Sequence, residues 1–260
     1  PPSPPPYRQQ NGSGSMFRQF MLIIGVSILI ATLFTAWTEP GLLPGALSAR
    51  LSTALQTPTP LPGITTQPAP TTTRIGIVAG HSGNDSGAVC PDALGGFREV
   101  DINLNIATRV RENLINLGYD VDLLAEFDTR LNDYQAVALV SIHADSCDYI
   151  EGATGFKVAA AMSTLYPEQA ARLTNCLQTR YSQATGLALH PGSVTLDMTD
   201  YHAFSEINSF TPAAIIEVGF MNLDRQILTQ QPDLLAQGIT SGILCYIRNE
   251  DINTQPTQIP

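Results

Sequence analysis

The sequence has few cysteines and few basic residues, and each shortage excludes a class of protein. Four cysteines in 260 residues are too few for a small disulfide scaffold, and none belongs to the C-x-x-C pairs of a structural zinc finger. Lysine and arginine together number 13 against 23 acidic residues, which gives a formal net charge of −10. So acidic a chain repels nucleic acid, and we expect no nucleic-acid partner.

The apolar residues, at 43% of the chain, suffice for one globular domain with additional segments. Residues 20–37 read FMLIIGVSILIATLFTAW, a run of 18 residues without a charge, which is long enough to cross the hydrocarbon of a membrane. Arg8 and Arg18 precede this run, and basic residues favour the cytoplasmic side. We therefore predict a single-pass protein of the cell membrane, with a disordered cytoplasmic tail at 1–16 and a lipid-contacting transmembrane anchor at 17–37.

Everything after the anchor is then expected on the extracytoplasmic side. If translation began at Met16, the same apolar run would instead resemble a signal peptide, although its length exceeds the usual apolar core of such peptides. Residues 38–73 are rich in proline and threonine and are predicted to form an extended linker. The polar residues 249–260 are predicted to be a disordered tail, which leaves 74–248 as the folded domain.

Within 74–248, short β-branched runs alternate with stretches of helical periodicity. Alternation of this kind predicts an α/β fold, a single domain with a mostly parallel twisted sheet flanked by helices on both faces. The expected strands lie in RIGIVA at 74, YDVDLLA at 119, AVALVSIH at 136, GFKVAAA at 155 and AAIIEVGF at 213. The expected helices run from about Val100 to Gly118, from Pro167 toward Gly186, and onward from Pro232.

Four side chains able to do chemistry stand near the ends of these elements. His81 and His143 follow or end strands, Glu217 lies inside the last strand, and Glu99 begins the first helix. In open α/β sheets the carboxyl ends of the strands form the site, so the four are expected at one rim. Two imidazoles and a carboxylate form the ligand set of a catalytic Zn²⁺, and a further carboxylate could take a proton from water.

Each of these four residues could instead have a purely structural role. His81 could sit in a solvent-exposed turn, and Glu99 could simply favour the dipole of its helix. His143 could be a hydrogen-bonded core histidine. Glu217 is the hardest to explain in this way, because an acid within an apolar strand needs a partner for its charge.

The strings IVAGHSGNDSGA, LVSIHAD, TGFKV and PAAIIEVGFMN, with a glutamate ahead of VDINLNIA, resemble in order the motifs of zinc-dependent N-acetylmuramoyl-L-alanine amidases. The resemblance implies Zn²⁺ ligands at His81, Glu99 and His143, with Glu217 as the catalytic carboxylate. It also implies a peptidoglycan substrate, cut at the amide between N-acetylmuramic acid and L-alanine. Protein partners are not indicated.

The sequence departs from the family pattern where substrate would bind. A Thr-Arg pair commonly follows the second strand directly, yet here LLAEFD intervenes before Thr129 and Arg130. Two alternatives therefore stay open: a zinc peptidase or amidase acting on another substrate, and a wall-binding or complex-associated subunit with little activity. No room exists for an inserted blocking helix, because only residues 162–166 precede the helix at Pro167.

Other polar residues and cysteines are expected near the predicted site or in loops beside it. His202 is a candidate for the substrate cleft, whereas His190 is expected in an exposed loop. Asp85 and Asp145 follow the two histidine ligands and could accept a hydrogen bond from an imidazole. Cys90 and Cys147 follow the same histidines and could form a disulfide outside the cytoplasm, whereas no pairing is predicted for Cys176 and Cys245.

Overall fold

The computed structural model describes residues 21–22, 24–27 and 73–253. The short amino-terminal piece is helical and exposed, and no helix among the described residues is long and apolar enough to cross a membrane. The predicted tail at 1–16, most of the predicted anchor at 17–37 and the predicted linker up to residue 72 lie outside the described residues.

The folded domain, residues 73–253, is built on one five-stranded sheet in the order β2-β1-β3-β5-β4. The first four strands in this order are parallel, while β4 runs antiparallel to β5, so the predicted mostly parallel sheet is confirmed. A parallel β4 would need a crossover helix after β3, and the segment 146–156 that joins them contains none. The strands are β1 (Arg74–Ala79), β2 (Asp120–Leu124), β3 (Ala138–Asp145), β4 (Lys157–Ala160) and β5 (Ala213–Phe220).

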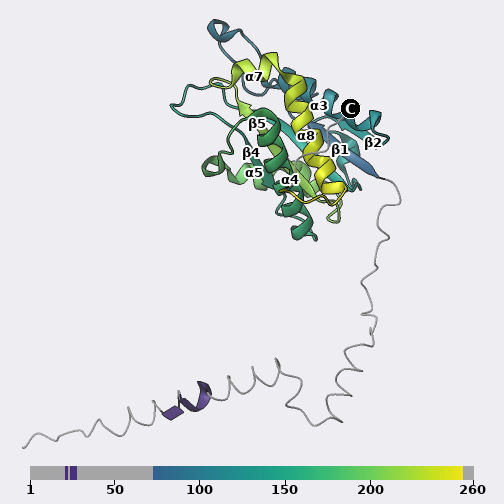
Figure 1. Ribbon diagram of the computed structural model, residues 1–260, viewed down its shortest axis with the longest axis vertical. Coiled ribbons are helices and arrows are strands. Elements are labelled where there is room, and N and C mark those ends of the chain that lie inside the picture. Colours follow the sequence, from purple (N-terminus) through teal and green to yellow (C-terminus); the bar gives the residue numbers. More distant parts are fainter. Residues whose placement is uncertain (1–20, 23, 28–72, 254–260) are drawn as a thin grey trace, which may run out of the picture. The chain divides into compact units, whose positions relative to one another are not determined.

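Three long helices cover one face of the sheet, and all three were predicted. They are α3 (Glu99–Asn116), α4 (Pro167–Thr185) and α8 (Pro232–Ile247). Figure 1 shows α8 between α3 and α4, and α8 packs against both. Their apolar stripes bury side chains such as Ile106, Leu177 and Ile239 against the strands, in the larger of two hydrophobic clusters.

The opposite face has a thinner cover than predicted. Two short helices, α5 (Leu196–Thr199) and α6 (His202–Glu206), pack Met198 and Phe204 against that face. Helices of four and five residues show no usable periodicity, so the sequence did not reveal them. The remaining elements are η2 (Asp92–Leu94), η3 (Thr129–Leu131), η4 (Pro191–Ser193) and α7 (Arg225–Gln230).

Two disulfides close the domain. The predicted Cys90–Cys147 bridge is confirmed, with Cα atoms 5.3 Å apart. A second bridge, Cys176–Cys245, joins α4 to α8 with Cα atoms 5.7 Å apart and was not predicted. It lies where the two helices pack, a contact between residues 69 positions apart that no spacing in the sequence encodes.

The domain extends beyond the predicted boundary at residue 248. Arg172 donates a hydrogen bond to the carbonyl of Glu250 at 2.7 Å, and the buried Arg180 donates to the carbonyl of Asp251 at 3.2 Å. These contacts hold residues 250 and 251 against α4, so the first part of the predicted disordered tail is ordered. Residues 254–260 lie outside the described residues.

Candidate metal centre

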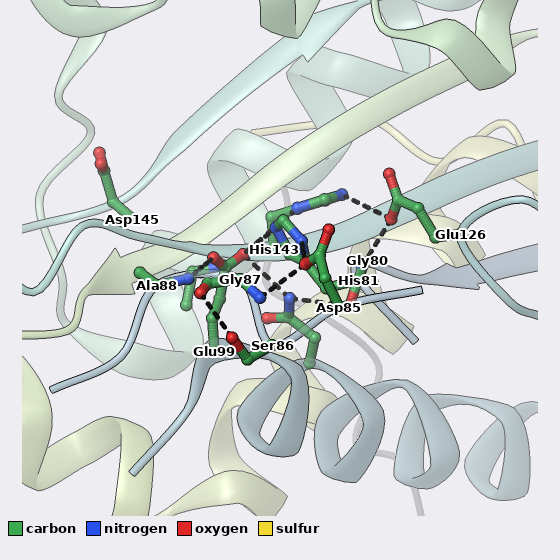
Figure 2. Close-up of polar contacts among 12 residues, drawn as sticks. Gly80, His81, Asp85, Ser86, Gly87, Ala88, Glu99, Glu126, His143 and Asp145 are labelled. Carbon is green, nitrogen blue, oxygen red and sulfur yellow. Dashed lines mark hydrogen bonds and ion pairs between the residues drawn. The ribbon is translucent and has the colours of Figure 1, made fainter. Parts of the chain in front are cut away.

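Three of the predicted site residues converge at the carboxyl end of the sheet. His81 lies in the turn after β1, His143 lies near the end of β3, and Glu99 is the first residue of α3. Figure 2 shows their side chains directed toward one another. Glu99 Oε1 lies 3.2 Å from His81 Nε2 and 3.3 Å from His143 Nδ1, and one ligand atom from each residue lies within 4.8 Å of the others.

The local backbone explains how such close approach is possible. A Cβ on Gly80 would lie 2.4 Å from the ring of His143, so only glycine allows the ring to occupy this position. Residue His81 has a φ of 64°, a left-handed conformation that is rare outside glycine. The turn therefore combines a close contact at Gly80 with a strained backbone at His81.

The carboxylate of Glu99 is fixed by backbone and side-chain donors. Oε2 accepts a hydrogen bond from the N–H of Ala88 at 3.0 Å, and Oε1 accepts from the N–H of Ala144 at 3.3 Å and from Asn103 Nδ2 at 3.1 Å. The segment after His81 and the strand that carries His143 thus both hold the carboxylate in place.

Charge interactions within the cluster hold Glu99 anionic. Burial alone would raise the pKa of Glu99, but hydrogen bonds from His143, His81 and Ala88 outweigh it and place the pKa below its usual range. The hydrogen bond to Glu99 raises the pKa of His81 to about 9.

The donor set fits zinc. Two imidazole nitrogens and one carboxylate leave a coordination position open for water, which is the arrangement of catalytic zinc sites. The nitrogen of His143 that faces the cluster is Nδ1, which lies 3.3 Å from Glu99 Oε1, so each ring presents one nitrogen to the carboxylate.

Glu217 lies on β5 directly opposite His143 of β3 and Lys157 of β4 in the strand registers. Burial raises the pKa of its carboxyl to about 7, and its Oε2 atom has no hydrogen-bond partner. A carboxyl group that titrates near neutral pH suits proton transfer in both directions. It lines the same pocket of about 490 Å³ as His81, Glu99 and His143.

Comparison with known proteins agrees with this arrangement. The sequence model of the family described as N-acetylmuramoyl-L-alanine amidase matches residues 75–245, which is well over half of the chain. The chain belongs to this family. None of the curated proteins gives a significant match.

Solved structures of similar fold include several amidases. The N-acetylmuramoyl-L-alanine amidase from Clostridium difficile 630 is 23% identical, with a TM-score of 0.54, over 69% of this chain and 99% of that one. The catalytic domain of the amidase CwlV from Bacillus (Paenibacillus) polymyxa var. colistinus is 26% identical, with a TM-score of 0.51, over 68% and 99%. The amidase AmiC2 of Nostoc punctiforme is 24% identical, with a TM-score of 0.51, over 67% and 97%.

The secondary site residues of this amidase lie in different surroundings. His202, the candidate for the substrate cleft, lines the same pocket as the cluster. Asp85 Oδ1 lies 2.7 Å from His81 Nδ1, the contact expected of a carboxylate that orients an imidazole. Asp145 instead pairs with the buried Lys157. His190 is half-buried rather than exposed, because its Nδ1 contacts Ser193 Oγ at 2.7 Å and its ring packs edge-on to Phe220.

Sequence reasoning missed Glu126 and Tyr201, which also line the pocket of this amidase. Glu126 stands two residues after β2, so the strand-end rule that selected the histidines could have found it. The Thr129–Arg130 pair, in contrast, points elsewhere. Arg130 is paired with Asp128 at 2.7 Å and with Asp122 at 3.4 Å, and it does not line the pocket.

Proposed function

We propose that this amidase holds Zn²⁺ on His81, Glu99 and His143 and hydrolyses the amide between N-acetylmuramic acid and L-alanine in peptidoglycan. The convergence of two imidazoles and one carboxylate within 4.8 Å carries the proposal, together with membership of the family. When bound, zinc supplies a Lewis acid for the scissile carbonyl and lowers the pKa of water.

The chain's own residues then supply the proton transfers. Glu217, as the carboxylate, accepts a proton from the attacking water and afterwards delivers it to the leaving amine of L-alanine. Its location opposite His143 places it beside the ligand cluster. Asp85 keeps the His81 ring oriented through Nδ1, which leaves Nε2 facing Glu99 and available as a ligand.

Metal analysis combined with product analysis tests this proposal. The purified full chain is expected to hold one zinc per molecule and to release intact stem peptides with a free L-alanine amino group from muropeptides, identified by mass spectrometry. A preparation that holds zinc but cuts elsewhere in the stem would replace the proposal by the zinc-peptidase alternative. One that binds sacculi and releases nothing would indicate the wall-binding alternative.

The acidic lining of the pocket favours a second class of substrate, one other than the muramic acid–L-alanine amide. The lining contains six acidic residues, namely Glu99, Glu126, Asp145, Asp197, Asp200 and Glu217, and no lysine or arginine. A bound Zn²⁺ would offset two of these charges, and the buried Lys157 pairs with Asp145, so an acidic excess remains. A second candidate function is therefore hydrolysis of a peptide or amide that lacks free carboxylates near the scissile bond, which the same product analysis detects.

We further propose that residues 17–37 anchor the enzyme in the cell membrane, with the catalytic domain on the extracytoplasmic side, where peptidoglycan lies. The uncharged run at 20–37 and the preceding Arg8 and Arg18 support this topology. Protease added to intact spheroplasts is expected to remove the catalytic domain. Cleavage only after permeabilisation would overturn the orientation.

A further inference from the structure

Glu126 is a buried carboxylate of the pocket that the proposed reaction does not use. Its residue is only 6% exposed, and it lies in the turn after β2, between the metal cluster and the wall formed by α5 and α6. A buried charge persists only when several donors satisfy it. The donors of Glu126 come from both sides of the pocket.

On the metal side, Glu126 holds the backbone of the His81 turn at two points. Its Oε2 accepts a hydrogen bond from the N–H of His81 at 2.6 Å, and its own N–H donates to the carbonyl of Ser82 at 3.0 Å. Figure 2 shows the carboxylate of Glu126 approaching the cluster from the side opposite Glu99. His81 has the left-handed φ of 64°, a conformation that persists only where surrounding contacts enforce it.

Glu126 also faces the second histidine. Its Oε2 lies 3.8 Å from His143 Nε2, the buried nitrogen that has no hydrogen-bond partner. The distance is too long for a hydrogen bond but close for two charged groups. One carboxylate thus approaches both imidazole residues on the side away from Glu99.

On the wall side, Glu126 Oε1 accepts a hydrogen bond from the Tyr201 hydroxyl at 2.9 Å and lies 2.9 Å from His202 Nε2. Tyr201 is buried, and the His202 ring stacks on Phe127 with centroids 4.2 Å apart. The carboxylate is therefore fixed by the α5–α6 wall and cannot turn away from the His81 turn.

We propose that Glu126 is a positioning residue for both histidine ligands and that it joins the metal cluster to the α5–α6 wall. It holds His81 in the strained conformation that directs Nε2 to Glu99, and it faces the free nitrogen of His143. This inference rests on the proposed zinc site. Carboxylates that orient metal-bound histidines are typically worth 10- to 100-fold in metal affinity or activity.

The test measures zinc affinity by competition with a chelator, on the full chain, in three variants. Glu126→Ala removes every side-chain contact, keeps the backbone hydrogen bond to Ser82, and is expected to weaken zinc binding by about 10- to 100-fold. Glu126→Gln keeps an acceptor for the His81 N–H but places an amide nitrogen beside Tyr201 and His202, so a smaller loss, about threefold or more, is expected from the same range of effects. Glu206→Gln is the matched control, because Glu206 contacts His202 Nδ1 at 2.9 Å without contacting the His81 turn, and its affinity should stay within about twofold.

Thermal unfolding without zinc shows which variants fold. Wild-type zinc affinity in folded Glu126→Ala would overturn the inference, and so would an equal loss in Glu206→Gln, which would assign the effect to His202. If Glu126→Ala does not fold, Glu126→Gln decides, and wild-type affinity there overturns the inference. A wild-type chain that binds no zinc overturns the proposed function first, so the two failures are distinguishable.

Discussion

One face of the sheet packs against the long helices α3, α4 and α8, whereas the other packs against the short helices α5 and α6 and irregular segments. The first face holds the larger hydrophobic cluster and one disulfide between its helices. The second face contributes Met198 and Tyr201 to the pocket wall. The comparison indicates that the long-helix face supplies most of the stability, while the short-helix face and the strand ends supply the site.

The largest expected effects on activity come from substitutions at or just after the ends of the strands. Glu217→Gln should retain zinc while turnover falls by about a hundredfold to ten-thousandfold, because the proton acceptor is lost but no ligand is. His81→Ala should lose zinc and activity together. Zinc content and amide cleavage are measured on the same preparation, with the exposed Glu112→Gln as control. A fully active, zinc-loaded Glu217→Gln would refute the assignment of the base.

The two faces should respond differently to loss of a buried side chain. Leu177→Ala on α4 leaves a cavity in the larger cluster and should cost about 2–5 kcal/mol of unfolding free energy, with kcat and KM of the folded enzyme unchanged. Met198→Ala removes a side chain that also lines the pocket and should raise KM. Urea unfolding and steady-state kinetics of both variants make the comparison. A changed KM in Leu177→Ala would contradict the division between faces.

The two disulfides provide a further test of the division between stability and the site. Replacing both Cys176 and Cys245 by alanine should cost about 2–4 kcal/mol of stability without altering zinc affinity. Replacing Cys90 and Cys147 should cost a similar amount, since the loops are of similar length, but should also weaken zinc binding, because the bridge ties the segments on either side of the cluster. Unfolding and chelator competition, both under non-reducing conditions, measure the two effects. Equal zinc affinities in the two double variants would show that the two disulfides do not differ in their effect on the site.

The smallest expected effect lies at Asp128, which caps η3 beside the short-helix face. The hydrogen bond from Arg130 lowers the pKa of Asp128 to about 2, so its contribution to stability is complete above the unfolded-state pKa of about 3.9 and is lost as the pH falls through about 2. Asp128→Asn should therefore be less stable than wild type at pH 7, and the difference should shrink below about pH 4 and disappear below about pH 2. The exposed Asp148→Asn is the control for urea unfolding across this range. A difference independent of pH would exclude the ion pair as its cause.

Helices and strands with a clear hydrophobic periodicity in the sequence were predictable. Elements whose structure depends on contacts between distant residues were not. Five β-branched runs and three amphipathic stretches correspond to the five strands and three long helices. His81, Glu99 and His143 were predicted to meet because parallel strands end at one edge of the sheet, and they do. The antiparallel β4, the helices α5 and α6, and the Cys176–Cys245 bridge depend on tertiary contacts that no local pattern records.

Glu126 is the instructive omission. The segment LLAEFD departs from the family pattern, in which a Thr-Arg pair follows the second strand directly, and in this chain it supplies the buried carboxylate of the pocket. Arg130 is engaged with Asp122 and Asp128 on the outside of the domain, while Glu126 within that segment lines the pocket. Its role depends on contacts with His81, Tyr201 and His202, which lie far from it in the sequence.

The order of the disulfides along the chain has a consequence for oxidative folding. Cys90 pairs with Cys147, the next cysteine in sequence, and Cys176 pairs with Cys245, the next after it, so the two covalent loops neither overlap nor nest. Of the three pairings open to four cysteines, this is the one in which each thiol meets its correct partner first as the chain emerges amino terminus first. Pairing in the order of synthesis is therefore expected to favour the two native bridges over the two other pairings.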